Sequence, residues 1–375
     1  MNIARVRHLF YPDMPRDFFY ELSAQQADRG YHVDVLTWKK DGGFSKELVT
    51  AGFFVHRLPG LNFGVRGLAQ EYPYLPSLPA LIEALKPDVV HVESHLFLTA
   101  FQAVKKANKL RLPCVVTVHG VLAERGIIAN FAQNVYLRSL GTKVFRGADR
   151  VICLTKSNAA EIENYGCPSE KIRLVPNAVD TRLFKPNEER EDNLVVWVGR
   201  FVPEKGVEYL IKAANIILKK SGAFRFLLIG YGPLKPKITK MANDLGLLHR
   251  FVTITGPMSR EEIATILSKA TIFAFPSLRE GLPVSVFEAM ASGVPVVGSD
   301  IAGIREIILD RQNGILVPPK KPEVLAQAIL SLLDDENQRR ELGKNARRLM
   351  IEKYSWDTTI KGIEKVYHEA IAQAD

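Results

Sequence analysis

The chain is poor in cysteine and has no long apolar run, and each of these features excludes a class of protein. Its cysteines are Cys114, Cys153 and Cys167, and no two of them have C-x-x-C spacing. A small, odd number of cysteines argues against a disulfide framework and favours buried thiols in a reducing compartment. The amino terminus, MNIARVRHLFYPD, carries arginines where a signal peptide has apolar residues, and no segment reaches the roughly 18 apolar residues of a membrane-spanning helix. We therefore expect a cytoplasmic protein.

The motifs of several functional classes are also missing. The first strand-like run leads into LFYPDMPRDFF, which lacks the G-x-G-x-x-G fingerprint of a nicotinamide-dependent oxidoreductase. No D-x-D follows a strand-like run, and no set of histidine, cysteine and acidic residues has metal-ligand spacing. The net charge of +9 is spread over both halves, without a basic arm or a nucleic-acid motif. We therefore expect no metal, no required cofactor and no nucleic-acid partner.

The length and composition predict two folded domains. A chain of 375 residues exceeds what one hydrophobic core usually serves. Hydrophobic residues make up 47% of the chain and charged residues 24%, so each half can bury a core. Short β-branched runs, among them HVDVLT, CVVTV and LVVWVG, alternate with helical stretches along the sequence. This alternation predicts an α/β fold in which parallel sheets are covered by helices on both faces.

The alternation is interrupted once, by PNAVDTRLFKPNEEREDN, which is rich in proline, asparagine and charge. Such a segment is typical of a linker, here between a domain over residues 1–180 and a second over residues 181–354. Residues 355–375 have apolar residues at helical spacing, so we expect a last helix that packs on a partner, for which the first domain is a candidate. Two doubly wound domains in tandem would bring the carboxyl ends of both sheets to a cleft, where ligands of this architecture bind.

A candidate phosphate site follows the strand LVVWVG, in the sequence VGRFVPEKG. Arg200 and Lys205 flank the expected start of a helix near Lys205, where unpaired backbone N–H groups and a partial positive charge favour a di- or triphosphate. Gly199 lets a ligand approach the backbone closely. Gly230 and Gly232, in GYGPL, repeat that design after the next strand, although a lone G-x-G is weak evidence. Two exposed cations on a loop explain the spacing of Arg200 and Lys205 at least as well.

Two glutamates stand in an otherwise apolar stretch, REGLPVSVFEAMASGVPVV. Glu280 falls in a loop after the strand TIFAFP, and Pro283 suits the first turn of the helix that carries Glu288. From Pro283 to Glu288 a helix rises roughly 7 to 8 Å, which matches two hydroxylated rings of one ligand. Carboxylates accept hydrogen bonds from vicinal hydroxyls, so one glutamate can hold a hexose and the other a ribose. An outward-facing Glu288 on an amphipathic helix is the alternative.

Together, the E-x7-E spacing, the GRFVPEKG segment and VPNAVD at the domain junction resemble the retaining glycosyltransferase family four, which has the GT-B fold. The resemblance covers nearly the whole chain, and in the first half it rests on PDVVHVESH and VVTVHG. It implies two Rossmann-like, doubly wound domains facing a central cleft, with the acceptor bound to the first and the nucleotide-sugar to the second. The implied activity is transfer of a hexose-type sugar from a UDP-, GDP- or ADP-sugar to a sugar, lipid or lipid-linked acceptor.

The resemblance also implies roles for individual residues. Arg200 and Lys205 match the pair that binds the donor pyrophosphate and offsets charge on the leaving oxygen. Glu280 matches the glutamate that contacts the transferred sugar, and Glu288 the one that binds ribose hydroxyls. His119, in VTVHG, matches the histidine that faces the donor sugar across the cleft, whereas a lone histidine at a strand end is more often structural. The implied donor-binding set is Gly199, Arg200, Lys205, Gly230, Gly232, Glu280, Gly281, Leu282, Pro283, Val284 and Glu288.

One departure from the family lies in the first loop. The family usually has a Gly-Gly pair there, which lets the backbone approach the donor phosphate and the acceptor, whereas this chain has Pro15 and Arg16. This loop therefore lacks the glycines that allow backbone contact in the family, and Arg16 is a candidate for a charged contact to phosphate or acceptor instead.

The implied mechanism retains configuration without a covalent carboxylate intermediate. A double displacement uses two carboxyl groups roughly 5 to 5.5 Å apart, less than the span expected between the two glutamates. We expect the acceptor hydroxyl to attack from the face that the nucleoside diphosphate leaves, with a departing phosphate oxygen as the base. A sugar-nucleotide epimerase or hydrolase of the same architecture would bind the same donor, and a non-catalytic nucleotide-sugar or carbohydrate-binding protein would bind without turnover.

The acceptor is the least readable part of the sequence. The segments GFFVHRLPGLNFGVRGL and ERGIIANFAQNVYLRSLGTKVFR mix aromatic, aliphatic and arginine residues. If exposed, they suit a lipid-linked acceptor and peripheral contact with the anionic inner face of a membrane, but core packing explains them equally well. A soluble sugar acceptor stays open, as does the donor nucleobase.

Overall fold

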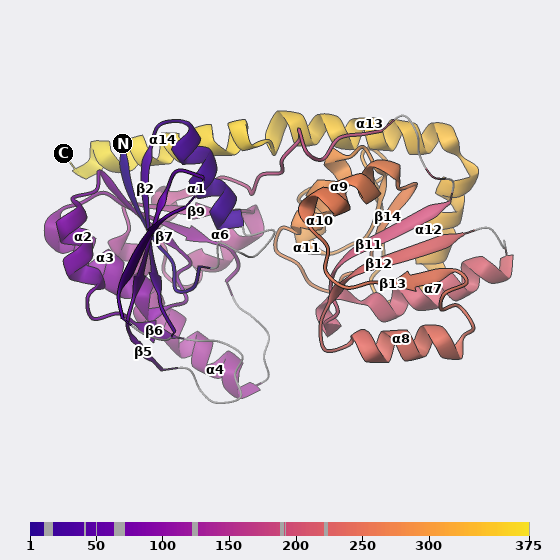
Figure 1. The fold of residues 1–375 in the computed structure, drawn as a ribbon, viewed down its shortest axis with the longest axis horizontal. Helices are drawn as coiled ribbons and strands as arrows, with labels where there is room; N and C mark the ends of the chain where they lie inside the picture. Colours follow the sequence, from indigo (N-terminus) through magenta and orange to yellow (C-terminus); the bar gives the residue numbers. More distant parts are fainter. Residues whose placement is uncertain are drawn as a thin grey trace. The chain divides into compact units, whose positions relative to one another are not determined.

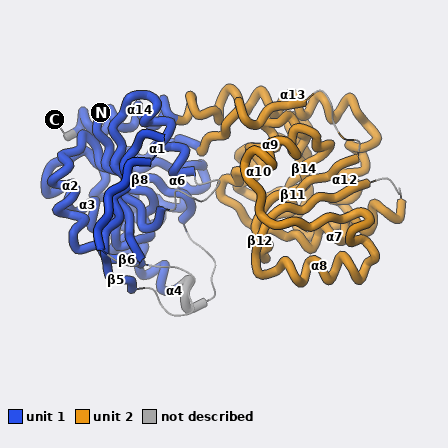
Figure 2. The backbone as a smooth tube through the Cα atoms, in the orientation of Figure 1, with its two compact units in different colours: residues 1–176, 360–375 blue, residues 177–359 orange. Residues whose placement is uncertain are grey.

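The computed structural model describes residues 1–10, 18–40, 43–49, 51–63, 72–121, 127–187, 191, 193–220 and 224–374. The chain forms two compact units, which are coloured separately in Figure 2. Unit 1 contains residues 1–176 and 360–375, and unit 2 contains residues 177–359. Within the described part of the chain, no helix is both long enough and apolar enough to cross a bilayer.

Unit 1 is built on an eight-stranded sheet with the order β10-β9-β8-β7-β1-β2-β4-β3. The strands are parallel except for β3, which pairs antiparallel with β4 at the edge. Their bounds are β1 (Asn2–Val6), β2 (His32–Trp38), β3 (Ser45–Leu48), β4 (Phe54–Leu58), β7 (Val89–Glu93), β8 (Cys114–Val118), β9 (Arg150–Cys153) and β10 (Ile172–Leu174). A short separate ribbon is formed by β5 (Leu61–Asn62) and β6 (Pro73–Tyr74). The parallel sheet confirms the predicted α/β class, while the antiparallel edge strand was not predicted.

Helices cover this sheet in Figure 1. They are α1 (Phe18–Asp28), α2 (Leu78–Leu85), α3 (Leu98–Leu110), α4 (Ile127–Tyr136), α5 (Thr142–Gly147) and α6 (Lys156–Glu163), with a π-helical turn at Leu137–Gly141 and a 3-10 turn at Ser169–Lys171. The chain moves from β1 to β2 in one direction across the sheet and from β7 to β8 in the other. Because both crossovers are right-handed, α1, which follows β1, lies on the opposite face of the sheet from α3, which follows β7.

The two faces of the unit 1 sheet differ in chemistry. Successive side chains of a strand point to opposite faces, so one set of alternate positions meets each layer of helices. One set belongs to a large buried apolar cluster, which includes Ala4, Val6, Leu36, Val90, Val92, Val116, Val118, Val151 and Cys153. The other set contains Arg5, His91 and Glu93, all at most 2% exposed. The second set therefore buries a cluster of charged side chains at the centre of the sheet.

The last helix, α14 (Trp356–Ala374), supplies part of unit 1 from the far end of the chain. The Tyr367 hydroxyl lies 2.7 Å from His91 Nδ1 and accepts a longer bond of 3.4 Å from Gln26 Nε2. Glu369 pairs with Arg150 and Arg173, whose Nε atoms lie 3.1 and 2.6 Å from its Oε2. This helix thus closes the polar face of the sheet together with α1.

Unit 2 is a six-stranded parallel sheet with the order β13-β12-β11-β14-β15-β16. The strands are β11 (Leu194–Arg200), β12 (Arg225–Tyr231), β13 (Val252–Ile254), β14 (Ile272–Phe275), β15 (Val296–Ser299) and β16 (Ile315–Val317). All six coincide with apolar runs of the sequence, because strands covered on both faces need apolar side chains at nearly every position. Trp197 and Phe273 are fully buried at its centre.

The helices of unit 2 lie on both sides of its sheet (Figure 1). They are α7 (Val207–Lys220), α8 (Lys235–Asp244), α9 (Arg260–Lys269), α10 (Val284–Ala291), α11 (Ala302–Arg305), α12 (Pro322–Asp334) and α13 (Glu336–Lys353), with a 3-10 turn at Pro203–Lys205. α7 packs on α8 and α12, whereas α10 packs on α9 and α13. The start of α9 follows from local sequence, since Ser259 and Glu262 form a capping box.

The segment expected to be a linker is in part packed into unit 2. The Phe184 side chain is fully buried, and its carbonyl oxygen accepts a hydrogen bond from the Arg347 guanidinium. The same guanidinium donates to the Thr181 carbonyl oxygen at 2.8 Å. The segment was predicted to be a linker between domains. It is instead anchored to unit 2 by one buried side chain and by hydrogen bonds to two of its backbone carbonyl oxygens.

The three cysteines are free and buried, as predicted. Burial raises the pKa of the thiols of Cys153 and Cys167 to about 12. Thiols of this kind are inert at neutral pH, because the thiolate is the reactive form.

Close packing of α13 on the end of α10 makes Gly343 a sensitive position. A Cβ atom there would lie 2.1 Å from the Gly293 carbonyl oxygen. We expect Gly343→Ala to lower the free energy of unfolding by about 1 to 3 kcal/mol, although Gly→Ala in a helix is otherwise favourable by roughly 0.5 to 1 kcal/mol. Urea denaturation measures the change.

The matched control for this substitution is Gly362→Ala in α14. A Cβ atom there would lie 3.1 Å from a methyl group of Val175, a contact that small side-chain movement relieves. Equal free energies of unfolding for Gly343→Ala and Gly362→Ala would contradict the close helix approach.

Candidate functional site

The polar residues predicted for donor binding lie on loops at one edge of the unit 2 sheet. The sheet order places β11 between β12 and β14, so the chain leaves β11 in one direction and β14 in the other. The carboxyl ends of the strands at such a switch point form a crevice in doubly wound sheets. The loop 201–206 follows β11 and the loop 276–283 follows β14. The topology therefore brings these two loops to the same position.

Lys205 and Glu280 meet directly between these loops. Lys205 Nζ lies 2.5 Å from Glu280 Oε1, and the Ser277 hydroxyl donates to the same oxygen at 2.6 Å. The side chains of Lys205 and Glu280 are only 16% and 10% exposed, so solvent screens the pair weakly. Lys205 Nζ also lies 5.2 Å from the centre of the Phe275 ring. The sequence placed Glu280 on a loop and Lys205 near the start of a helix but did not predict that they pair.

Backbone contacts hold the two loops together. The Leu278 N–H donates to the Glu204 carbonyl oxygen at 2.7 Å. A Cβ atom on Gly206, whose φ is +59°, would lie 2.1 Å from the Pro276 carbonyl oxygen, so no other residue fits this turn without movement. On the other side of the second loop, a Cβ atom on Gly303 would lie 2.1 Å from the Gly281 carbonyl oxygen. The position of Glu280 is thus fixed by backbone on both sides.

The glycines after β11 and β12 have a packing role within unit 2. A Cβ atom on Gly230 would lie 1.8 Å from the Gly199 carbonyl oxygen, and one on Gly232 would lie 2.5 Å from the Phe201 carbonyl oxygen. Both glycines have positive φ, of +151° and +146°. The close approach of the ends of β11 and β12 is therefore a sufficient reason for these glycines, whether or not they also contact a ligand.

The remaining predicted residues of unit 2 differ in exposure. Arg200 is exposed at the end of β11, and among the described residues it has no ion-pair partner. Pro283 caps α10, which begins at Val284, one position later than predicted. Glu288 is 1% exposed on α10 and has interaction partners within the protein. The outward-facing alternative for Glu288 is therefore wrong.

In unit 1, His119 follows β8 and belongs to a cluster of charged side chains. Its Nε2 atom lies 2.8 Å from Glu93 Oε2, at the end of the neighbouring strand β7. The other oxygen, Glu93 Oε1, lies 3.2 Å from Arg5 Nε on β1. His119 is 23% exposed at its side chain, whereas Glu93 and Arg5 are buried. The His119 ring packs edge-on against Phe19, with ring centres 4.7 Å apart.

Burial and charge oppose each other at Glu93. Burial favours the neutral carboxylic acid, but the hydrogen bond with His119 and the charge of Arg5 outweigh it and hold the pKa of Glu93 below its ordinary value. Burial lowers the pKa of His91 to about 4, so His91 is neutral at pH 7. Its ring nitrogens lie 2.7 Å from the hydroxyls of Tyr367 and Thr117. Burial also raises the pKa of Tyr367 to about 12, which keeps the phenol protonated.

The sequence did not identify Glu93, Arg5 or Tyr367 as part of a site. A signal was present, because VVHVESH has polar residues at every second position where a buried strand is expected. Such alternation in the middle of a doubly covered sheet indicates one polar face. Arg16, the candidate acceptor contact, lies outside the described residues.

The two segments considered for acceptor or membrane contact are mixed in exposure. Phe53 is fully buried, whereas Leu61 and Phe63 are 61% and 58% exposed. Phe131 and Val135 on α4 are 70% and 51% exposed. Both segments therefore contribute exposed apolar side chains to unit 1 in addition to its core.

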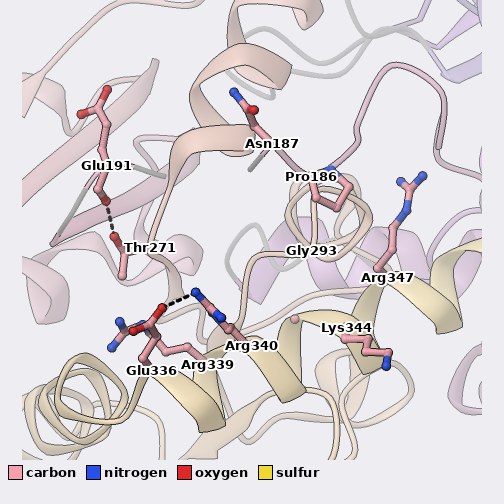
Figure 3. A pocket seen from close by; sticks show the side chains of 11 residues that line it. Pro186, Asn187, Glu191, Thr271, Gly293, Glu336, Arg339, Arg340, Lys344 and Arg347 are labelled. Atoms are coloured by element: carbon pink, nitrogen blue, oxygen red, sulfur yellow. Dashed lines mark hydrogen bonds and ion pairs between the residues drawn. The ribbon is translucent and has the colours of Figure 1, made fainter. Parts of the chain in front are cut away.

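A separate pocket of 690 Å³ lies in unit 2 and contains none of the predicted residues (Figure 3). Thr271 and Gly293 line it, and they precede β14 and β15, so it lies at the amino edge of the sheet, opposite the two loops. Its arginines are largely engaged in the fold. Arg339 donates to two carbonyl oxygens at the end of α12, and Arg340 pairs with Glu336. This pocket is a feature of packing.

Comparison with protein families matches both halves of the chain. Residues 17–183 match the model for Glycosyltransferase Family 4, and residues 179–349 match the model for Glycosyl transferases group 1. A glycosyltransferase of Methanocaldococcus jannaschii is 30% identical over 316 residues, which cover 84% of each chain. The chain belongs to the group 1 glycosyltransferases. This confirms the resemblance found in the sequence.

Two further similarities add detail to this family assignment. An MMP α-(1→4)-mannosyltransferase of Mycolicibacterium hassiacum is 29% identical over 299 residues. The match covers 76% of the present chain and 71% of the mannosyltransferase. The solved structure of HepE from Anabaena in complex with UDP has a TM-score of 0.79 at 18% identity, and covers 98% of this chain and 100% of that one. The structural match confirms the GT-B fold.

The buried histidines of unit 1 make stability depend on pH. Burial lowers the pKa of His91 to about 4 and that of His95 to about 3, whereas both take up protons near pH 6.5 in the unfolded chain. The unfolded state binds more protons below pH 6.5, so the free energy of unfolding falls as the pH drops from about 6.5 to about 4. We expect a slope of up to about 1.4 kcal/mol per pH unit for each histidine.

Urea titrations between pH 7.5 and pH 4.5 measure this slope. His95→Gln is expected to make it shallower, while His249→Gln, at an exposed position, leaves it unchanged. A flat profile in the wild type below pH 6.5 would show that these histidines are not held neutral.

Proposed function

We propose that this glycosyltransferase moves a hexose-type sugar from a nucleotide-sugar to a hydroxyl of a sugar, lipid or lipid-linked acceptor, with retention of configuration and without a metal ion. The observation that carries the proposal is the Lys205–Glu280 pair at the carboxyl edge of the unit 2 sheet. A cation and a carboxylate held side by side suit a ligand that has a phosphate next to a hydroxylated ring. We assign donor binding to unit 2 and acceptor binding to unit 1.

The phosphate contacts come from the loop after β11. Arg200 is exposed and has no carboxylate partner among the described residues, so its guanidinium is available to an anion. Lys205 follows in the 3-10 turn, and the N–H groups at the start of α7 lie directly beyond Gly206. We propose that these groups bind the pyrophosphate and stabilise the charge that develops on the leaving oxygen. When phosphate draws Lys205 away, Glu280 is released to accept from sugar hydroxyls.

The sugars of the donor are assigned to the loop after β14 and to α10. Glu280 contacts the transferred hexose, and the backbone from Gly281 through Leu282 and Pro283 to Val284 lines the donor. Leu282 is 9% exposed and Val284 is 37% exposed, so this stretch reaches the surface of unit 2. Glu288 is assigned to the ribose, which must meet its buried carboxylate at the base of the site. Gly199, Gly230 and Gly232 complete the donor-binding set.

His119, on unit 1, is assigned to the transferred sugar. Its side chain is partly exposed, while its Nε2 atom is engaged by Glu93. One edge of the ring is therefore available to a ligand. A neutral imidazole can exchange a hydrogen bond with a sugar hydroxyl.

The proposed reaction occurs on one face of the sugar. The acceptor hydroxyl attacks the anomeric carbon as the bond to the nucleoside diphosphate breaks, and its proton passes to the departing phosphate oxygen. Arg200 and Lys205 offset the negative charge on that oxygen, which is the role a metal ion serves in other transferases. No protein carboxylate needs to act as the nucleophile.

Because HepE is described in complex with UDP, a UDP-sugar is the first candidate, with GDP- and ADP-sugars as alternatives. The mannosyltransferase similarity supports a hexose as the transferred sugar.

The donor site is tested by isothermal titration with UDP-, GDP- and ADP-sugars. We expect one nucleotide series to bind, and Lys205→Ala to weaken binding and lower kcat by about 100- to 1,000-fold, the usual cost of removing one preorganised contact to developing charge. Glu288→Gln should weaken binding of the same series. Lys219→Ala is the matched control, because Lys219 is an exposed lysine in the last turn of α7.

If no member of the panel binds to the wild type, the donor site is wrong. Binding without transfer to any acceptor would favour a non-catalytic binding protein. Conversion of the donor without an acceptor would favour an epimerase or hydrolase.

Stereochemistry and metal dependence are tested on the product. We expect proton NMR of the new glycosidic linkage to show the anomeric configuration of the donor, because attack and departure share one face. Excess EDTA should leave kcat within about twofold, since Arg200 and Lys205 already supply the charge. An inverted product would reject the mechanism, and activity restored only by added Mg²⁺ or Mn²⁺ would reject metal independence.

A further inference from the structure

The carboxylate of Glu93 is shared between one permanent cation and one histidine. Arg5 Nε lies 3.2 Å from Oε1, and His119 Nε2 lies 2.8 Å from Oε2. Arg5 is charged at every working pH, so the Arg5–Glu93 pair is neutral as a whole. Arg5 therefore balances the charge of Glu93, and the contact between His119 Nε2 and the carboxylate is a hydrogen bond.

This contact decides which nitrogen of His119 carries the proton. An ionised carboxylate can only accept hydrogen bonds, so the nitrogen that faces it must be protonated. In a neutral imidazole the other nitrogen is then an acceptor. The geometry thus favours, for a neutral His119 ring, a proton on Nε2 and a lone pair on Nδ1.

The ion pair with Arg5 restricts how far the Glu93 carboxylate can turn from His119. The Arg5 guanidinium donates hydrogen bonds to the Ser23 hydroxyl and to the side-chain amide oxygen of Gln26, both on α1 and each at 2.5 Å. The side chains of Arg5 and Glu93 lie on the same face of the sheet, because Arg5 pairs with His91 and Glu93 pairs with Thr117 in its register. His119 follows directly after β8, the strand that carries Thr117. The orientation of the imidazole is therefore built into the sheet and α1.

We propose that Glu93 is a positioning residue, which fixes His119 as the Nε2–H tautomer and so makes Nδ1 a hydrogen-bond acceptor for a hydroxyl group of the transferred sugar. This inference rests on the proposed function, in which His119 contacts that sugar. It goes further by naming the atom, the direction of the hydrogen bond and the residue that sets both. It also excludes a role for His119 as a cation that binds phosphate.

A second histidine–carboxylate pair in the same sheet provides a structural comparison. His56 Nε2 lies 2.6 Å from Asp34 Oδ1, between β4 and β2. Both residues are buried, with 2% and 4% exposure, whereas the His119 side chain is 23% exposed. The Asp34–His56 pair therefore stabilises the fold without meeting a ligand. Asp34→Asn is the matched control for Glu93→Gln.

The tautomer is measured first, in the free protein. Long-range ¹H–¹⁵N correlation spectra of histidine-labelled protein distinguish protonated from unprotonated ring nitrogens, and His119→Asn identifies the signals of His119. We expect a single Nε2–H tautomer in the wild type near pH 7.5 and a mixture of tautomers in Glu93→Gln. An Nδ1–H tautomer in the wild type would overturn the inference, whether or not any variant folds.

Function is measured next with the nucleotide-sugar that binds and with the same nucleotide lacking the sugar. Glu93→Gln is expected to lower kcat by about 10- to 100-fold, the range found when a carboxylate that orients a metal-binding histidine is removed. Binding of the free nucleotide should stay within about twofold, because its contacts lie on unit 2. Asp34→Asn should lower the unfolding midpoint but leave the kcat of the folded fraction within about twofold. If Glu93→Gln does not fold, Glu93→Asp is used in its place, because it keeps the charge but shortens the side chain that reaches His119.

The outcomes separate this inference from the proposed function. A wild type that binds no nucleotide overturns the proposed function and the sugar contact together. A wild type that binds nucleotide, combined with unchanged kcat in Glu93→Gln, overturns the positioning role alone. Equal losses of kcat in Glu93→Gln and Asp34→Asn would reduce Glu93 to a structural residue.

Discussion

A buried carboxylate must be compensated, and the architecture of unit 1 follows from how Glu93 meets this requirement. An isolated ionised group in a protein interior costs several kcal/mol unless charges and hydrogen bonds replace its water. Arg5 supplies the charge from the adjacent strand, α1 supplies partners for Arg5, and His119 supplies the second hydrogen bond. The polar face of the sheet therefore works as one unit. Removing any member leaves another buried group unpaired.

The fold was largely readable from the sequence because parallel strands buried on both faces must be apolar runs. The runs predicted in both halves became the strands of the two parallel sheets. The edge strand β3 (Ser45–Leu48) escaped notice, since its four residues are half or fully exposed and carry no apolar pattern. The segment around Phe184 was taken for a linker because a single buried aromatic side chain has no periodicity. In both places the structure is determined by packing against the rest of the unit and not by the hydrophobic periodicity of the local sequence.

The candidate site was readable in part. Strand-end loops identified Lys205 and Glu280 as polar residues in the right places, but their contact depends on the order of strands in the sheet, which spacing along the chain does not encode. Glu93 and Arg5 were missed for a related reason. They are separated by more than 80 residues, and only the neighbouring positions of β7 and β1 bring them together. Contacts that depend on the order of strands in the sheet could therefore be found only in the structure.

The contribution of α14 to unit 1 has a consequence for biosynthesis. Residues 1–176 leave the ribosome long before residues 360–375, because all of unit 2 is translated between them. At roughly 5 to 20 residues per second, this delay is on the order of 10 s or more. During that time Tyr367, one of the two hydroxyl partners of His91, is absent, and the part of the polar face that α14 covers is exposed. The first unit to be synthesised is thus the last to be completed, and a nascent chain must keep that face from other partners until Tyr367 arrives.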